Sequence, residues 1–165
     1  SSAASDVYKR QPQDCPKDGT GDDDASPLTR PPLFDHLDFR RARGTFPWAD
    51  DWHPGLPLIY SRWGRYHHRP ERPDGSYDPL ALLPMADLPG PSVWVRFGPG
   101  EPLRQLVSLE LTIHFLEPVH DDWVLADFRA RWLGSGYALS ECDLWSGGRL
   151  VAVANQMMLL RQRGG

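Results

Sequence analysis

Residues 105–118 read QLVSLELTIHFLEP, and apolar and polar side chains alternate along this stretch. One face of an extended chain would carry only apolar side chains, namely Val107, Leu109, Leu111, Ile113 and Phe115. The opposite face would carry Ser108, Glu110, Thr112 and His114. This period of two predicts a β-strand that rests its apolar face on a core.

Three further strands are predicted downstream, in the ranges 123–133, 137–145 and 149–161. The loops between them, 134–136 and 146–148, are short and contain glycine, as tight hairpins require. The last of these ranges is apolar on both faces over residues 150–160. We therefore expect it to lie in the interior of the sheet or to be covered on both sides.

One helix is predicted upstream of these strands. Asp78-Pro79 is a strong start signal, because aspartate caps free backbone N–H groups and proline fits the first helical position. Pro89-Gly90-Pro91 is expected to end this helix. Period-two patterns favour short strands at 34–40 and 92–97 and a longer strand at 56–66.

The order of these elements is a strand, a helix and then a run of antiparallel strands. One helix cannot line a bundle, but it can lie along the concave face of a curled sheet. We therefore predict an α+β fold over residues 31–165, a single hotdog domain with one helix wrapped by a curled antiparallel sheet. A cone-shaped ligand-binding barrel is the alternative within the same class.

Residues 1–30 contain no aliphatic stretch and are rich in Gly, Pro and Asp. A segment of this composition cannot bury enough apolar surface to offset the entropy lost on ordering, so it is predicted to be a disordered tail. Its first eleven residues, SSAASDVYKRQ, resemble adaptor-derived sequence. If they are adaptor-derived, residues 1–11 are not native to the protein.

The chain of 165 residues carries a formal net charge of −4. It lacks the positive field that nucleic-acid binding favours, so we expect no nucleic-acid partner. No apolar run approaches the roughly 18 residues that a membrane span requires. Two cysteines are too few for a disulfide scaffold. These observations indicate a cytoplasmic protein without a membrane span.

Three segments resemble the C-terminal hotdog domain of the acyl-CoA thioesterase II family and the wider thioesterase-like superfamily. The helix segment reads DPLALLPMADLPGPSVW at residues 78–94. The long strand is the stretch 105–118 quoted above, and the final strand reads GGRLVAVANQMMLLR at 147–161. The three motifs occur in the family's order and span residues 78–161, about half of the chain.

The resemblance implies a catalytic site made by Asp87, Ser108 and Gln156. In that family an Asp, a Ser or Thr, and a Gln hold and activate the water that attacks a thioester. The implied activity is hydrolysis of fatty acyl-CoA to a free fatty acid and CoA, without a covalent intermediate, a cofactor or a metal. Read from the residues alone, Asp87 is more often a capping or surface carboxylate than a base, and Ser108 is more often a polar-face strand residue. Gln156 alone is as often a buried structural amide as a catalytic group.

The resemblance also implies a partner, because the family's chains usually carry two hotdog domains and receive the acyl chain between them. We expect either a missing N-terminal half or a homodimer. The alternatives to a thioesterase are a non-catalytic hotdog half that binds an acyl ligand or pairs with a catalytic half, and an unrelated small-ligand carrier.

Other polar residues carry weaker hypotheses. His67-His68 lacks the spaced ligands of a zinc site and is interpreted as a solvated turn. His114 with Glu110 resembles the His and acid pair of hotdog dehydratases, a minor alternative. Cys142 is expected to be a small packed side chain.

Overall fold

The curled sheet of this protein has six strands in the order β1-β2-β4-β5-β6-β3, and every neighbouring pair is antiparallel. The computed structural model describes residues 9–17 and 32–162. The strands are β1 (Leu37–Arg43), β2 (Ile59–Tyr66), β3 (Arg104–Phe115), β4 (Val124–Gly134), β5 (Tyr137–Ser146) and β6 (Arg149–Gln162). Strand β6 lies between β5 and β3, which confirms its expected interior position.

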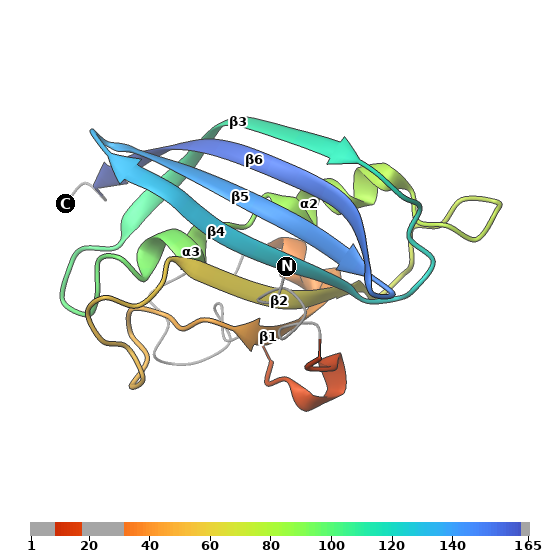
Figure 1. Ribbon diagram of the computed structural model, residues 1–165, viewed down its shortest axis with the longest axis horizontal. Helices are drawn as coiled ribbons and strands as arrows, with labels where there is room; N and C mark the ends of the chain where they lie inside the picture. The colour runs from red at the N-terminus through yellow and green to blue at the C-terminus, as the bar shows by residue number, and fades with distance from the viewer. Residues whose placement is uncertain (1–8, 18–31, 163–165) are drawn as a thin grey trace.

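The helical layer lies inside the curl of the sheet (Figure 1). It consists of the short helices η3 (Pro79–Leu82), α2 (Leu83–Ala86) and α3 (Gly90–Trp94), while η1 (Pro12–Asp14) and η2 (Pro32–Asp35) lie upstream. Asp78 caps the start as predicted, since its carboxylate accepts a hydrogen bond from the N–H of Leu80 at 3.0 Å. None of the helices in the described residues has the length and apolar character needed to cross a bilayer.

The predicted strand at 92–97 is wrong, because this region begins as helix α3. Proline ends one helix and fits the first turn of another, since its missing N–H is needed only beyond the first turn. Pro89 therefore lies between α2 and α3, and Pro91 fits the first turn of α3, so the chain does not return to an extended form. Trp94 at the end of α3 donates its indole N–H to the carbonyl of Arg104 at 2.9 Å, so α3 also fixes the start of β3.

The hydrophobic core fills the space between the helices and the face of the sheet that they cover, which we call the inner face. Leu82, Met85 and Ala86 of the helical layer are buried there. They pack with inner-face residues of β4, β5 and β6, including Val124, Ala126, Phe128, Leu144, Ala152 and Ala154. This burial supplies the apolar contact that a helix as short as α2 needs in order to persist.

Strand β3 contains a bulge that the sequence pattern does not reveal. Ser108 pairs with Met158 and Glu110 pairs with Met157, so Leu109 is an extra residue without a partner on β6. The extra residue reverses the alternation. Ser108 therefore lies on the inner face together with Leu111 and not opposite it, and Leu109 is 55% exposed. The predicted strand is confirmed, but its predicted division into one apolar and one polar face is wrong.

Residues 9–17 contact the outer face of the sheet, opposite the helices. Cys15 is buried with Trp63 and Leu125 in a small apolar cluster. The indole N–H of Trp63 donates to the carbonyl of Arg10 at 2.9 Å, and Lys17 forms an isolated bridge with Arg40. These contacts differ from the disordered tail expected over residues 1–30, because tryptophan on the outer face provides a docking surface. Residues 1–8 and 18–31 of that segment lie outside the described residues.

The position of the core predicts that two leucine-to-alanine replacements lower the free energy of unfolding by very different amounts. Replacing Leu144, which is fully buried, with alanine should lower the free energy of unfolding by about 2–5 kcal/mol through lost burial and an unfilled cavity. Leu80→Ala is the matched control, because Leu80 is 63% exposed, and should change stability by less than about 0.5 kcal/mol. Urea unfolding followed by tryptophan fluorescence measures both. Equal losses would contradict the assignment of the core.

Candidate active site

Gln156 is a buried polar side chain in the middle of an apolar strand. It is 3% exposed and lies on β6 between Leu111 of β3 and Ser140 of β5. An amide in such a place must find hydrogen-bond partners or lose about 1–3 kcal/mol for each unsatisfied group. Its partners therefore identify the groups around which the site is built.

The side chains of Asp87, Ser108 and Gln156 form a closed hydrogen-bonded triangle. Gln156 Nε2 donates to Ser108 Oγ at 2.7 Å and also to Asp87 Oδ1. The hydroxyl of Ser108 donates to the same Oδ1 at 3.0 Å. The structure thus brings together the three residues that the resemblance singled out. We call this group the polar triangle.

The polar triangle lies at the boundary between core and solvent. Gln156 is buried, whereas Asp87 and Ser108 are exposed residues. Among the described residues, no donor reaches the second carboxylate oxygen of Asp87, Oδ2. One side of the triangle is therefore anchored in the protein, and the other presents a carboxylate oxygen that can accept a proton or a hydrogen bond from a small molecule.

Asp87 is held by the end of a helix and by a buried arginine. It is the residue that follows α2, and its backbone N–H donates to the carbonyl of Leu83 at 3.0 Å. The next residue, Leu88, offers its carbonyl oxygen to Arg62 Nη2 at 2.5 Å. Arg62 thereby connects β2 to the junction of α2 and α3 and restricts where the carboxylate of Asp87 can lie.

Arg62 is a positioning residue that the sequence interpretation missed. It is 1% exposed, and its guanidinium carbon lies 5.2–5.5 Å from the ring centroids of three aromatic residues, Phe39, Tyr60 and Phe128. Such cation–π contacts help to offset the cost of burying the charge. The signal was present in the period of strand 56–66, where Arg62 alternates in phase with Tyr60 and Gly64, but a charged strand residue normally indicates the solvent face.

The amide orientation of Gln156 is determined by the carboxylate. Turning the amide over would place its carbonyl oxygen against Asp87, so that two acceptors would face each other without a proton between them. In the orientation found, Gln156 Oε1 is buried and accepts no hydrogen bond from the described residues. An unsatisfied buried oxygen lowers stability. The arrangement is retained here because the NH₂ group of the same amide donates hydrogen bonds to both Asp87 and Ser108.

Cys142 of β5 lies in the same narrow crevice as Gln156, beside Ala86 and Phe128. It is 3% exposed, and burial raises the pKa of its thiol well above the usual range. The thiol therefore stays protonated at neutral pH and is a poor nucleophile, because the thiolate is the reactive form.

Two other polar groups do not take part in the triangle. Asp127 is 2% exposed, but Arg43 and Arg129 bind its two oxygens at 2.7 and 3.0 Å, so its charge is neutralised on the outer face. His114 and Glu110 follow the bulge and lie on the face of β3 opposite Leu111, where Glu110 accepts a hydrogen bond from Thr112. The pair proposed by the dehydratase alternative is thus separated from Asp87.

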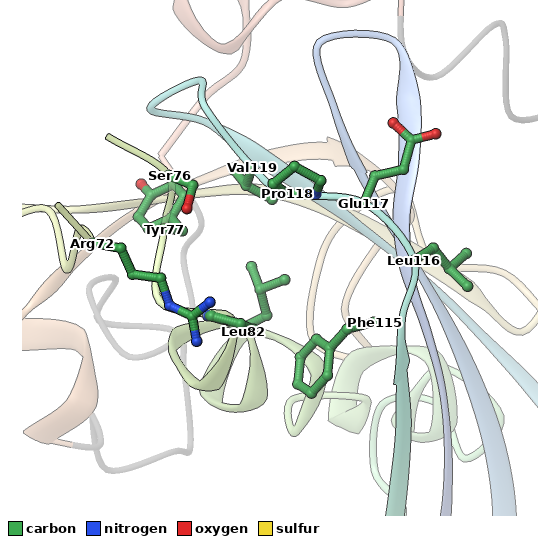
Figure 2. Close-up of a pocket in the computed structure, with 10 residues that line it drawn as sticks. Arg72, Ser76, Tyr77, Leu82, Phe115, Leu116, Glu117, Pro118 and Val119 are labelled. Atoms are coloured by element: carbon green, nitrogen blue, oxygen red, sulfur yellow. The ribbon is translucent and has the colours of Figure 1, made fainter. Parts of the chain in front are cut away.

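A shallow hollow lies at the far end of β3, beyond Phe115. It has a volume of about 200 Å³ and is formed by the segments 72–82 and 115–119. Figure 2 shows Phe115 and Leu82 facing this space, with Tyr77 and Val119 above them and Arg72 reaching in from one side. Its walls are mainly apolar, while Arg72 and Glu117 are exposed at its edge. We call it the apolar hollow.

The sheet, the enclosed helices and the polar triangle together define a hotdog-fold domain with a polar site on its inner face. The sequence matches the acyl-CoA thioesterase C-terminal domain family over residues 12–160. The chain therefore belongs to this family. No curated protein matches the sequence.

Solved structures confirm the hotdog fold. A hotdog-fold protein of unknown function from Alicyclobacillus acidocaldarius is 20% identical, with a TM-score of 0.67, and the match covers 94% of this chain and 54% of that chain. A thioesterase from Haemophilus influenzae is 18% identical, with a TM-score of 0.56, covering 67% of this chain and 76% of that chain. A mutant thioesterase from Pseudomonas aeruginosa is 19% identical, with a TM-score of 0.57 and coverages of 75% and 81%.

The environment of Cys142 yields a direct test of whether a thiol takes part in the chemistry. Cys142→Ala should leave the rate of any thioester hydrolysis within about twofold, because the protonated, buried thiol is not the nucleophile. Treatment of the native protein with an alkylating reagent should likewise leave the rate unchanged, and mass spectrometry should find Cys142 modified only after unfolding. Rapid inactivation that the alanine variant escapes would contradict this assignment.

Proposed function

We propose that this domain is a thioester hydrolase that converts a fatty acyl-CoA and water into a free fatty acid and CoA. The observation that carries the proposal is the polar triangle, in which an exposed carboxylate is oriented by a buried amide and a hydroxyl. Membership of the acyl-CoA thioesterase C-terminal domain family supports the same reaction class. The specific roles below are proposed from the geometry of Asp87, Ser108 and Gln156.

Asp87 acts as the general base. Its Oδ1 is occupied by Ser108 and Gln156, which leaves Oδ2 to take a proton from water. The oxygen of that water attacks the thioester carbonyl carbon, and the carbonyl π electrons move to its oxygen. The tetrahedral intermediate then expels the sulfur of CoA, and the proton held by Asp87 passes to that sulfur. Positioned acid–base groups of this kind contribute about 10²–10⁴ in rate.

Ser108 and Gln156 orient the base and the water. Their hydrogens are already donated within the triangle, so both groups hold the carboxylate of Asp87 in place. A free lone pair on Ser108 Oγ can in addition accept a hydrogen bond from the water beside Asp87. The direct bond from Gln156 to the carboxylate restricts the rotation of Asp87. This preorganisation lowers the cost of reaching the reactive geometry, which is the main way in which polar groups accelerate acyl transfer.

The test is loss of turnover without loss of folding. Asp87→Asn should lower kcat for a fatty acyl-CoA by about 10²–10⁴, because the amide cannot take the proton. Gln156→Ala should lower it by about 10²–10³. Release of CoA thiol, measured with a chromogenic thiol reagent on the assembled protein, reports the rate, and thermal melting reports folding. Asp87→Glu is the matched variant that keeps the charge and should retain part of the activity.

Two results would overturn the proposal in different ways. Hydrolysis that persists at the wild-type rate in folded Asp87→Asn would exclude Asp87 as the base. A wild-type protein that binds acyl-CoA without releasing thiol would indicate the alternative function, a non-catalytic hotdog half that holds an acyl ligand.

We also propose that β3 pairs with a second hotdog domain, either in the same polypeptide or in a second copy. Strand β3 is an edge strand, and each of its residues is at least partly exposed. Unpaired strand edges are templates for further pairing. Leu109 and Phe115 on this strand are 55% and 42% exposed, which leaves apolar surface for a partner to cover.

Pairing through β3 predicts that a charge at its bulge weakens association. If the partner is a second copy, Leu109→Lys should raise the dimer dissociation constant at least about tenfold, because a lysine ammonium would have to lose water in the interface. Leu80→Lys, an exposed leucine on η3, is the matched control and should leave association unchanged. Sedimentation analysis over a range of concentrations measures both. Equal association in wild type and Leu109→Lys would contradict pairing at this edge.

A further inference from the structure

A second hollow, distinct from the apolar hollow, lies at the opposite end of β3. Its volume is about 450 Å³, and three segments far apart in the sequence form it. Arg96 and Phe97 follow α3, Arg104 begins β3, and residues 134–136 make the hairpin between β4 and β5. We call it the arginine hollow.

The charges of the arginine hollow are not balanced. It contains two arginines, Arg96 and Arg104, and one acidic residue, Glu101. No ion pair involves either arginine within the described residues. Of the twelve other arginines in the described residues, seven are bound by carboxylates, namely Arg40, Arg43, Arg65, Arg69, Arg129, Arg131 and Arg149. In a chain of net charge −4, an unpaired positive site of this kind requires an explanation.

Arg104 is held in place although no acid binds it. Its guanidinium carbon lies 5.5 Å from the ring centroid of Phe97, and its Nε is buried without a hydrogen-bond partner in the described residues. Its carbonyl accepts the indole N–H of Trp94. Stacking on an aromatic ring restricts the guanidinium while leaving its outer N–H groups free to bind an anion.

Guanidinium groups are well suited to recognising phosphate, because their planar fork can donate two parallel hydrogen bonds to two oxygens. Two arginines against one glutamate leave a net positive field that favours an anion with more than one charge. The exposed hydroxyl of Ser135 in the hairpin is a further donor at the same hollow. The chemistry fits a phosphate ester or a diphosphate.

The position of the hollow relative to the polar triangle decides which phosphate it can take. Arg104, Leu106 and Ser108 lie on the same face of β3, because the bulge comes only after Ser108. Ser108 is four residue steps from Arg104, which is about 13 Å along a strand. The extended pantetheine arm of CoA, which joins the thioester sulfur to the first phosphate, can cross such a distance.

The two hollows make the two ends of β3 chemically different, with the arginine hollow at one end and the apolar hollow at the other. Its inner face runs from Arg104 through Ser108 to Leu111, Ile113 and Phe115, and Phe115 lines the apolar hollow. A positive site, a polar site and an apolar site thus follow one another along a single strand. A fatty acyl-CoA has the same order of parts, with phosphates, a thioester and then a hydrocarbon chain.

We propose that the arginine hollow binds the phosphate groups of CoA through Arg96 and Arg104, and so sets the direction in which an acyl-CoA lies along β3. This inference rests on the proposed thioester hydrolase activity. It adds a phosphate subsite and two specificity-determining arginines that act on the carrier half of the substrate and not on the reacting atoms.

The experiment compares two thioesters with the same acyl chain, one on CoA and one on N-acetylcysteamine, which has no phosphate. For the double variant Arg96→Gln/Arg104→Gln, kcat/KM for the CoA ester should fall at least about tenfold through a higher KM, as expected for lost charge-assisted hydrogen bonds. The N-acetylcysteamine ester should change less than twofold. Arg104→Lys should recover part of the loss, and Arg131→Gln, an arginine paired with Glu141 outside the hollow, is the matched control.

Hydrolysis of the two thioesters and calorimetric titration test the phosphate subsite independently of the proposed hydrolase activity. Equal losses on both thioesters, or no loss on either, would overturn the phosphate subsite while leaving the hydrolase proposal intact. If neither thioester is hydrolysed, the proposed function fails, and calorimetric titration with adenosine 3′,5′-bisphosphate still decides the subsite. Binding that is lost in the double variant and kept in Arg131→Gln supports it, and binding that is absent or unchanged in the double variant overturns it.

Discussion

The hydrogen bonds of one buried amide join the elements that form the candidate site of this domain. Gln156 sits in an apolar strand and must satisfy its N–H groups, because a buried donor without a partner costs about 1–3 kcal/mol. It does so by reaching the residue after α2, Asp87, and the neighbouring strand through Ser108. The end of the helix and the register of β3 against β6 are therefore coupled at one point. The candidate site is this point of attachment.

The coupling depends on a single extra residue. If β3 paired regularly with β6, Ser108 and Leu111 would lie on opposite faces, and the hydroxyl would be directed away from Gln156. Leu109 absorbs the difference, since it stands outside the pairing and is largely exposed. The same inner face can then carry Arg104 and Ser108 before the bulge and a continuous apolar row after it. A bulge thus allows one strand both to close the core and to present polar groups.

Whether a feature of the fold or the site could be predicted from the sequence depends on how far apart in the sequence its determining residues lie. Local signals succeeded: the Asp78 cap, the glycine hairpins and the interior character of β6 are each encoded in a few neighbouring residues. The joint family motifs pointed to Asp87, Ser108 and Gln156, which no single residue type would have marked, and the structure places these three side chains in contact. The bulge escaped prediction because residues 105–115 alternate without interruption, and alternation cannot show which residue its partner strand skips. Arg62 and the docking of residues 9–17 depend on aromatic side chains that are distant in sequence, and periodicity carries no information about them.

The exposure of the polar triangle has a physical consequence for how such a site can work. Hydrogen bonds and charges weaken in the high dielectric of water, so Asp87 and Ser108 direct a reaction most strongly when something excludes solvent from them. The edge of β3 is left open, with Arg104 of the arginine hollow at one end and Phe115 of the apolar hollow at the other. In the proposed assembly, a partner on this edge would cover the polar triangle. In that assembly, binding of the partner to the edge strand would also exclude water from Asp87 and Ser108. The proposed association and the proposed catalysis would therefore depend on the same surface.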